Sequence, residues 1–258
     1  MKRAARLNAI LDLLAADGEV NVDELVERFG ASAATTRRDL DSLAEQRLLT
    51  RTHGGAVAHD VAYELPIRYK SHQRTQQKES IAQAAAALVA PGMVVGLSGG
   101  TTTTAIAAAL AARDDLSAGP GITVVTNAVN IAAQLATRPD IKVVVTGGVI
   151  HSRSYELVGP FVEQLLRGVR LDMAFIGVNG MDAEAGATTQ DEREAAVNRM
   201  MAERARRAVV VTDSSKLGTV AFAAVGGAEL FPVLLTDDGA TAASLAALRA
   251  AGYEVLTA

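Results

Sequence analysis

Apolar positions along the first 57 residues follow the spacing of short amphipathic helices. One set recurs at i, i+3, i+4 and i+7 and predicts a helix that ends at Gly18: Leu7, Ile10, Leu11 and Leu14. Asn21, three residues before Glu24, predicts the capped start of a second, two-turn helix that stops at Gly30. The segment therefore begins with two helices joined by a short turn.

A third helix and a small hairpin complete this N-terminal segment. Ser32 is a favoured N-cap residue, and the apolar positions after it predict a helix that runs to about Gln46. An apolar run at 48–50 then meets the pair Gly54 and Gly55, which is typical of a hairpin, or wing. We expect residues 1–57 to form a three-helix unit with a wing.

Beyond residue 57 the pattern changes twice. From 58 to 78 the apolar spacing lapses, Pro66 intervenes and polar residues gather, which predicts a linker. After it, short β-branched runs alternate with alanine-rich helical stretches. The strand candidates are 93–97, 122–125, 142–145, 173–176, 209–211 and 233–235, and the helix candidates are 103–112, 129–136, 161–167, 193–206 and 242–251. This alternation predicts that residues 79–258 form an α/β domain whose mostly parallel sheet is covered on both faces.

Composition narrows the possible chemistry. The chain has 258 residues, of which 49% are hydrophobic, so it is long enough for two folded domains. It has no cysteine, which excludes disulfides and thiolate metal sites, and its 4 histidines lack the spacing of a zinc site. No apolar run approaches the ~20 residues that cross a bilayer. We therefore expect a cytoplasmic protein without a metal, a cofactor or a membrane segment.

The net charge of the whole chain and the charge of the third predicted helix point to different conclusions. A net charge of −4 argues mildly against a nucleic-acid-binding protein. In the third predicted helix, however, Ala34 and Arg38 point outward when Thr36 faces the core, and Thr35 and Arg37 lie on the flanks. A short turn followed by a capped helix is the geometry of a helix-turn-helix, whose second helix enters the DNA major groove by its N-terminus. The alternative is that the arginine pair is an ordinary solvated face of a helical packing unit.

A segment rich in glycine and hydroxyl residues joins the first strand of the α/β domain to its helix. It consists of Ser98, Gly99, Gly100, Thr101, Thr102 and Thr103. Free backbone amides at a helix N-terminus, together with the helix dipole, bind phosphate. The lysine of a Walker loop and the G-x-G-x-x-G pattern are both missing here, which disfavours nucleotides. The alternative is a tight strand-to-helix turn capped by threonines.

Other loops follow their strands in a similar way. Asn127, Gly148 and Asn179 each come shortly after a predicted strand, and Lys216 lies in the loop after a fourth. Because open α/β sheets bind their ligands at the carboxyl ends of the strands, we expect these loops to converge on one site. Lys216 would then balance the charge of a bound anion.

Two sets of residues resemble one family of bacterial regulators. The runs 31–40 and 48–56, with Leu43 between them, are similar to the DNA-binding signature of DeoR-type regulators. The segments 100–103, 125–127, 147–148, 175–177 and 213–216 are similar to the sensor domain of the same family. Four residues depart from the family pattern: Ala31, Thr36, Ser98 and Asn198.

The resemblance implies a fold and a function. It implies a winged helix-turn-helix domain (1–57), a linker (58–78) and an effector-binding sensor domain (79–258) that resembles sugar-phosphate isomerases and coenzyme A transferases. It also implies a repressor of a sugar catabolic operon, which binds a double-stranded DNA operator and is released by a phosphorylated sugar. Because helix-turn-helix proteins read paired half-sites, we expect a homodimer or homotetramer.

The predicted site residues follow from these patterns and the resemblance. The DNA-binding set is Ser32, Ala34, Thr35, Arg37, Arg38, Arg51 and His53. The effector-binding set is Ser98, Gly99, Gly100, Thr101, Thr102, Thr103, Asn127, Gly148, Asn179 and Lys216. No catalytic residue is predicted. The competing hypothesis is an isomerase of phosphosugars, which would need a carboxylate base near the phosphate, and Asp182 and Glu184 are the candidates.

Overall fold

The chain divides into two compact units. The computed structural model describes residues 1–46, 48–57, 67 and 73–258. Its units are Met1–Leu65, the N-terminal unit, and Pro66–Ala258, the C-terminal unit. Most of the predicted linker, 58–78, lies outside the described residues. The predicted end of the linker is corrected here, because residues 75–78 form the first turn of helix α5 (Thr75–Ala87). That turn carries only polar side chains, so the apolar spacing begins later, at Ile81.

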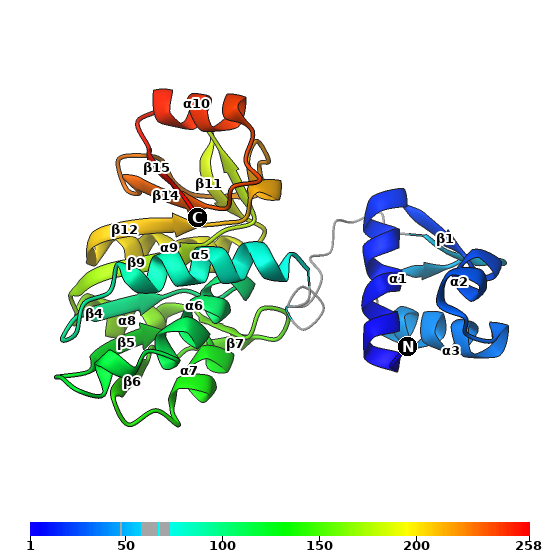
Figure 1. The fold of residues 1–258 in the computed structure, drawn as a ribbon, viewed down its shortest axis with the longest axis horizontal. Coiled ribbons are helices and arrows are strands. Elements are labelled where there is room, and N and C mark those ends of the chain that lie inside the picture. Colours follow the sequence, from blue (N-terminus) through cyan, green and yellow to red (C-terminus); the bar gives the residue numbers. More distant parts are fainter. Residues whose placement is uncertain (47, 58–66, 68–72) are drawn as a thin grey trace. The chain divides into compact units, whose positions relative to one another are not determined.

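The N-terminal unit contains three helices (Figure 1). They are α1 (Arg3–Asp17), α2 (Val22–Phe29) and α3 (Ala33–Glu45). The first two end where Gly18 and Gly30 adopt left-handed backbone conformations, which glycine tolerates best. Asn21 and Ser32 cap α2 and α3 by accepting hydrogen bonds from first-turn amides. Caps and glycines thus set the bounds of these helices.

A small antiparallel sheet forms the wing of this unit. Its strands, in spatial order, are β1 (Glu19–Asn21), β3 (Gly55–Val57) and β2 (Thr50–Arg51). Gly55 has no substitute here, because a Cβ at this position would overlap the carbonyl of Val20. The apolar pattern did not predict β1, since a three-residue strand with one buried residue carries no periodicity.

The C-terminal unit is built on a seven-stranded sheet in which every pair of neighbours is parallel. In spatial order the strands are β15 (Glu254–Thr257), β14 (Val233–Thr236), β12 (Ala205–Val211), β9 (Leu171–Gly177), β4 (Val94–Leu97), β5 (Ile122–Thr126) and β6 (Ile141–Val145). Strand β4 comes first in the chain but lies in the interior of the sheet.

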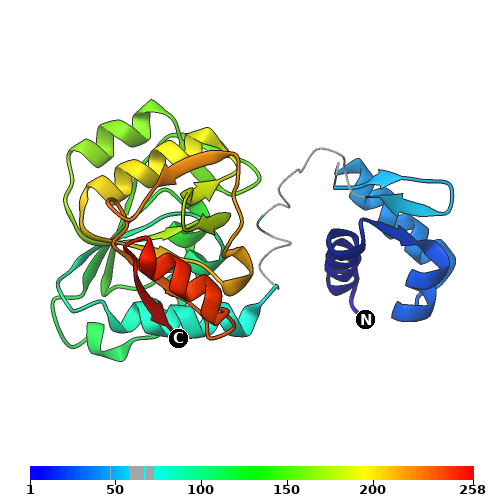
Figure 2. The ribbon, with the colours of Figure 1, turned by 90° about the horizontal axis from the view of Figure 1, so that it is seen from above.

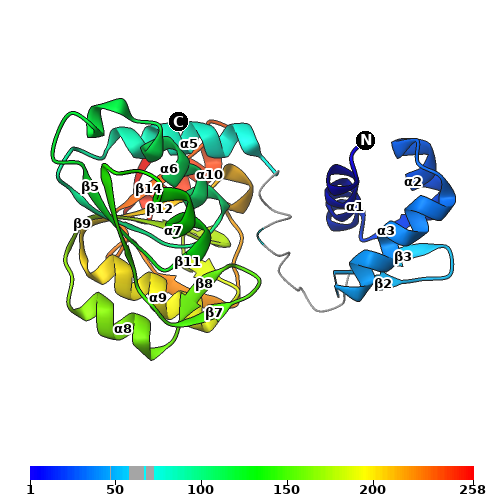
Figure 3. The same ribbon diagram turned by 90° about the horizontal axis from the view of Figure 1, so that it is seen from below.

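Helices cover both faces of this sheet, as Figures 2 and 3 show. One face carries α5, α6 (Thr101–Ala111) and α7 (Val129–Leu135). The other carries α8 (Pro160–Arg167), α9 (Glu192–Glu203) and the apolar side of α10 (Ala242–Ala250). Alternate residues of a strand serve the two cores: in β9, Phe175 packs with the first set of helices and Ile176 with the second. The apolar strands predicted this two-sided burial correctly.

Shorter elements connect these layers. A hairpin pairs β7 (Val149–His151) with β8 (Glu156–Val158), and a second small sheet contains β10 (Gly180–Asp182), β11 (Gly186–Thr189) and β13 (Ala223–Gly226). Two short 3-10 turns cover Asp114–Leu116 and Ser214–Lys216. The predicted helix 193–206 is another correction, because it ends at Glu203 and the next residues enter β12. Within the described part of the chain, no helix combines the length and apolarity needed to span a membrane.

Candidate functional site

The exposed face of α3 carries the charged residues predicted for DNA contact. The Ser32 hydroxyl accepts a hydrogen bond from the Thr35 amide, 3.2 Å away, which fixes the start of the helix. Ala34, Arg37 and Arg38 are exposed in its first turns. Neither arginine has an ion-pair partner among the residues that the structure describes. Their positive charge is therefore available to a ligand.

A buried carboxylate holds α3 in place. Asp39, the residue after the arginine pair, is 2% exposed and accepts a 2.5 Å hydrogen bond from Arg6 Nε of α1. Arg3 Nε lies 3.5 Å from the same carboxylate. A buried ion pair has to be complete, because leaving one charge alone in the interior is costly. Asp39 was missing from the predicted set, since nothing in the local pattern distinguishes an anchoring aspartate from an exposed one.

The wing residues of the predicted set differ from one another. Arg51 Nε donates a 2.8 Å hydrogen bond to Asp41 Oδ1, and its Nη1 donates to the carbonyl of Gly55. These bonds neutralise Arg51 and tie the wing to α3. His53, at the tip of the wing, is exposed.

The predicted effector segment, 98–103, lies where the strand order of the large sheet reverses. From β4 the chain moves to β5 and β6 on one side, and β9 then pairs with β4 on the other. In open α/β sheets, ligands bind at such a switch point, outside the carboxyl ends of the strands. The Gly177 amide, at the end of β9, donates a 3.0 Å hydrogen bond to Ser98 Oγ, at the end of β4. Ser98 thus ties the two strand ends together and is fully buried.

Backbone amides are free at the start of α6. Gly100 caps the helix with φ +124°, a conformation that side chains other than glycine rarely adopt. Within the described residues, the amides of residues 100–103 donate no hydrogen bond. The hydroxyls of Thr103 and Thr104 donate to the Gly100 carbonyl over 3.0 and 2.6 Å. Thr102 and Thr103 are buried, so Thr101 carries the accessible hydroxyl of this segment.

A buried glutamate lies directly over this segment. Glu156, in β8, is 5% exposed, and a Cβ added to Gly99 would overlap its side chain. Asn127, at the end of β5, donates a 3.0 Å hydrogen bond from Nδ2 to Glu156 Oε2. The Asn127 Oδ1 atom is buried and has no hydrogen-bond partner. Asn127 belongs to the predicted set but Glu156 does not, because a single glutamate in a short hairpin gives no local signal.

A second buried carboxylate lies nearby. Glu194, in the first turn of α9, accepts hydrogen bonds from Ser154 Oγ over 2.5 Å and lies 2.7 Å from His151 Nδ1. Asp191 caps the same helix, and its hydrogen bond with the Arg193 side chain lowers the pKa of the Asp191 carboxyl, although burial opposes the shift. Glu194 thus joins the β7–β8 hairpin to α9, and Asp191 fixes the start of that helix.

The remaining predicted effector residues make contacts with neighbouring loops and strands. Lys216 Nζ donates a 2.7 Å hydrogen bond to the Val178 carbonyl, one residue beyond Gly177. Asn179 Oδ1 accepts from the Gln190 amide over 3.2 Å. Gly148 packs at the base of the β7–β8 hairpin, where a Cβ would overlap Val158 and Val162.

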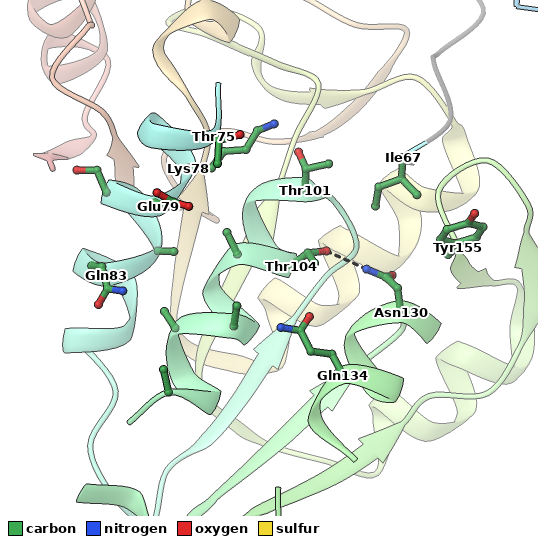
Figure 4. A pocket seen from close by; sticks show the side chains of 16 residues that line it. Ile67, Thr75, Lys78, Glu79, Gln83, Thr101, Thr104, Asn130, Gln134 and Tyr155 are labelled. Carbon is green, nitrogen blue, oxygen red and sulfur yellow. Dashed lines mark hydrogen bonds between the residues drawn. The ribbon is translucent and has the colours of Figure 1, made fainter. Parts of the chain in front are cut away.

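A cavity of about 800 Å³ opens beside the first turn of α6. Figure 4 shows Thr101 and Thr104 at its centre, α5 on one side, and Ile67 and Tyr155 on the other. Asn130 of α7 donates a 2.9 Å hydrogen bond to Thr104 Oγ1 at the cavity wall. The sequence analysis named only Thr101 among its lining residues.

The carboxylate suggested for isomerase chemistry has another task. Asp182 Oδ1 accepts hydrogen bonds from the amides of Ala185 and Glu184 over 3.0 and 2.9 Å. These backbone donors lower the pKa of the Asp182 carboxyl. A general base needs a pKa close to the working pH, so this shift makes Asp182 a weaker base. It shapes the turn between β10 and β11.

Comparisons with known proteins agree over almost the whole chain. The DeoR-like helix-turn-helix domain matches residues 6–61, and the DeoR C-terminal sensor domain matches residues 73–238. The chain is 32% identical over 237 residues to the glycerol-3-phosphate regulon repressor of Escherichia coli K12, covering 92% of each protein. It is 35% identical over 257 residues to the HTH-type transcriptional regulator GlpR of Haloferax volcanii, covering 99% of this chain and 98% of that protein.

Two solved structures are similar at lower identity. The full-length sorbitol operon regulator SorC from Klebsiella pneumoniae matches with a TM-score of 0.44 and 12% identity, covering 96% of this chain and 99% of that one. A ribose 5-phosphate isomerase from Methanocaldococcus jannaschii matches with a TM-score of 0.43 and 19% identity, covering 56% and 55%. The two domain matches and the full-length relatives carry the assignment: the chain belongs to the DeoR family of helix-turn-helix transcriptional regulators.

Proposed function

We propose that this protein represses a sugar catabolic operon in the cytoplasm by binding its operator through the N-terminus of α3. The exposed Arg37 and Arg38 support this role, because arginine pairs with guanine and phosphate through two parallel hydrogen bonds. Ser32, Ala34 and Thr35 lie beside them in the first turn. Arg51 is neutralised within the wing, so its expected share of DNA binding is small.

We propose further that a phosphorylated sugar is the effector that releases the operator. The observation that carries this proposal is the set of unbonded amides at residues 100–103, located at the switch point of the sheet. A phosphate there would accept from these amides and from the Thr101 hydroxyl, near the positive end of the α6 dipole. Lys216 supplies the nearest predicted cation. Two relatives are named for glycerol 3-phosphate or as GlpR, which is consistent with a small organic phosphate.

The active form is a homodimer or homotetramer. A helix-turn-helix unit of this size contacts one half-site, and two half-sites one helical turn apart require two copies of α3. The operator is then expected to be a near-palindrome. Light scattering of the full chain with and without operator DNA measures the number of copies.

A ligand screen tests the effector proposal directly. Thermal unfolding of the full chain is followed with glycerol 3-phosphate, ribose 5-phosphate, fructose 6-phosphate and inorganic phosphate, and with the unphosphorylated counterparts. A phosphosugar at 100 times its Kd should stabilise the protein by about 2.7 kcal/mol. Failure of every phosphosugar to shift the transition would contradict the proposal.

A matched pair of variants locates the phosphate. Thr101→Ala removes a hydroxyl donor to an ionised oxygen and should weaken phosphosugar binding at least about tenfold in calorimetry. Thr137→Ala removes an exposed hydroxyl at the end of α7 and serves as the control. Equal binding by the two variants would place the phosphate elsewhere.

A further inference from the structure

The cavity beside α6 continues directly from the proposed phosphate segment. Thr101 follows Gly100 in the chain and lines the cavity, and Thr104 lies one turn further along the same face (Figure 4). A phosphate on the first-turn amides therefore has this space next to it. The volume of about 800 Å³ lies within the range of small-molecule sites.

One lining residue of this cavity lies close to the start of the C-terminal unit. Ile67 lines the cavity and is only 9% exposed. Its amide donates a 2.8 Å hydrogen bond to the carbonyl of Arg153, in the turn of the β7–β8 hairpin. Ile67 thus belongs both to the region where a linker was predicted and to the lining of a cavity in the C-terminal unit.

Tyr155 lines the cavity from the same hairpin turn. Its backbone has φ +61°, which is uncommon for a residue with a bulky side chain. The Tyr155 amide donates to the His151 carbonyl over 2.8 Å, and its own carbonyl accepts from the Val129 amide over 3.0 Å. Strained backbone of this kind persists where the surrounding structure enforces it, often at ligand sites. The next residue, Glu156, lies over Gly99, so the turn spans both the cavity and the phosphate segment.

We propose that the sugar part of the effector binds in this cavity against Ile67 and Tyr155. This inference rests on the proposed phosphate position. It adds the location of the carbon skeleton and names Ile67, which lies in the sequence between the two matched family domains, as a contact.

Much of the lining is apolar and comes from alanines of the α5 and α6 segments: Ala82, Ala105, Ala108, Ala109 and Ala112. The remaining groups fit a hydroxylated carbon chain or ring. Asn130, Gln134 and Thr104 offer neutral amide and hydroxyl groups, which exchange hydrogen bonds with sugar hydroxyls. Ile67 and the Tyr155 ring offer apolar surface to the C–H faces of the same molecule. The charged groups of the lining, Lys78 and Glu79, lie across the cavity on α5 (Figure 4).

Direct contact with Ile67 gives regulation a physical basis. A ligand shifts a conformational equilibrium only as far as it interacts differently with the two states. An effector that touches Ile67 favours the state in which Ile67 lines the cavity. Inorganic phosphate has no carbon skeleton and makes no such contact.

The experiment compares the full-length wild type with Ile67→Ala, using inorganic phosphate and whichever of ribose 5-phosphate, fructose 6-phosphate and glycerol 3-phosphate binds the wild type most tightly. Calorimetry should show that Ile67→Ala binds the phosphosugar at least about fivefold more weakly and binds inorganic phosphate equally well. Fluorescence anisotropy at saturating phosphosugar should show that the variant stays on operator DNA that the wild type leaves.

A control variant makes the result specific. Val220→Ala truncates an aliphatic residue that is 62% exposed and should change neither reading. If Ile67→Ala matches the wild type in phosphosugar affinity and operator release, the inference is wrong while the effector proposal stands. Equal losses for inorganic phosphate and phosphosugar would also overturn it, and failure of the wild type to bind any phosphosugar would remove the proposed function itself.

Discussion

Individual charged residues have different roles in the N-terminal unit according to their partners. Asp39 is buried and holds two arginines of α1, whereas Asp41 is exposed and pairs with Arg51 of the wing. Arg38 has no ion-pair partner among the described residues. The net charge of the chain therefore says little about DNA binding, because the charge proposed to contact DNA lies on one exposed face of α3.

Arg38→Ala is expected to weaken operator binding by roughly 1–3 kcal/mol, because it removes a side chain placed to contact a base edge or phosphate. Fluorescence anisotropy at fixed salt measures the change. Arg167→Ala, which removes an arginine of α8 whose side chain is 74% exposed, is the control and should leave the affinity unchanged. Equal affinities for the two variants would rule out Arg38 as a DNA contact.

Glu156 presents the opposite charge at the proposed effector site. Its carboxylate lies over the segment whose amides would hold a phosphate, so an incoming anion has to overcome its repulsion. The Asn127 amide group offsets part of that negative charge. Anion affinity at this site is thus lower than the free amides alone would give.

Glu156→Gln keeps the size of the side chain and removes its charge, so inorganic phosphate is expected to bind at least about fivefold more tightly, or ~1 kcal/mol. Isothermal titration calorimetry provides the measurement. Glu163→Gln, at the surface of α8, controls for the overall change in net charge. Unchanged or weaker phosphate binding by Glu156→Gln would mean that the carboxylate does not oppose the anion.

At the scale of elements, side-chain hydrogen bonds hold α9 and the β7–β8 hairpin together. Asp191 caps α9 by accepting from the amides of Arg193 and Glu194, and Glu194 in turn holds Ser154 and His151 of the hairpin. The cap therefore stabilises more than the helix end. Loss of the cap should therefore weaken the hydrogen bonds between α9 and the hairpin.

Asp191→Ala is expected to destabilise the C-terminal unit by about 1 kcal/mol at pH 7, which lowers its unfolding temperature by about 2–4 °C. The pKa of Asp191 is lowered in the folded state, so the charged cap stabilises above the ordinary carboxyl pKa. That contribution disappears as the pH falls through the folded pKa. The difference between wild type and variant should accordingly shrink below about pH 4. Calorimetric scans across this range test the trend, with the exposed Asp238→Ala as control; a difference independent of pH would contradict it.

The elements also show which structural features can be predicted from local sequence patterns. Continuous apolar strands, glycine stops and N-caps are local signals, and they predicted β4, β5, β9 and the ends of α1 and α2. Strand β15 was missed because its residues are only partly buried at the edge of the sheet. Glu156, Ile67 and Tyr155 were missed for a different reason: chain crossings bring them to α6, and no pattern of neighbouring residues records those crossings.

For the whole molecule, we expect the proposed effector and the operator to affect each other's binding through one equilibrium. If a phosphosugar lowers operator affinity by some factor, saturating operator must lower phosphosugar affinity by the same factor. Calorimetric titration of the phosphosugar with and without operator DNA measures that factor, and a DNA of scrambled sequence is the control. Identical phosphosugar affinities in the three titrations would show that the two sites are not coupled.

The interior position of β4 in the large sheet affects the order in which the two units fold during synthesis. Val95 of β4 pairs with Met173 of β9, far along the chain, whereas strand pairing in the N-terminal unit spans a shorter stretch, as from Val20 to Ala56. Non-local pairing is slow, because a long loop must close before any contact rewards it. At about 5–20 residues per second, a ribosome needs several seconds after releasing the first unit to supply β9. A nascent chain therefore acquires its folded helix-turn-helix unit before its large sheet, and for that interval the proposed DNA-binding unit is present without the proposed effector site.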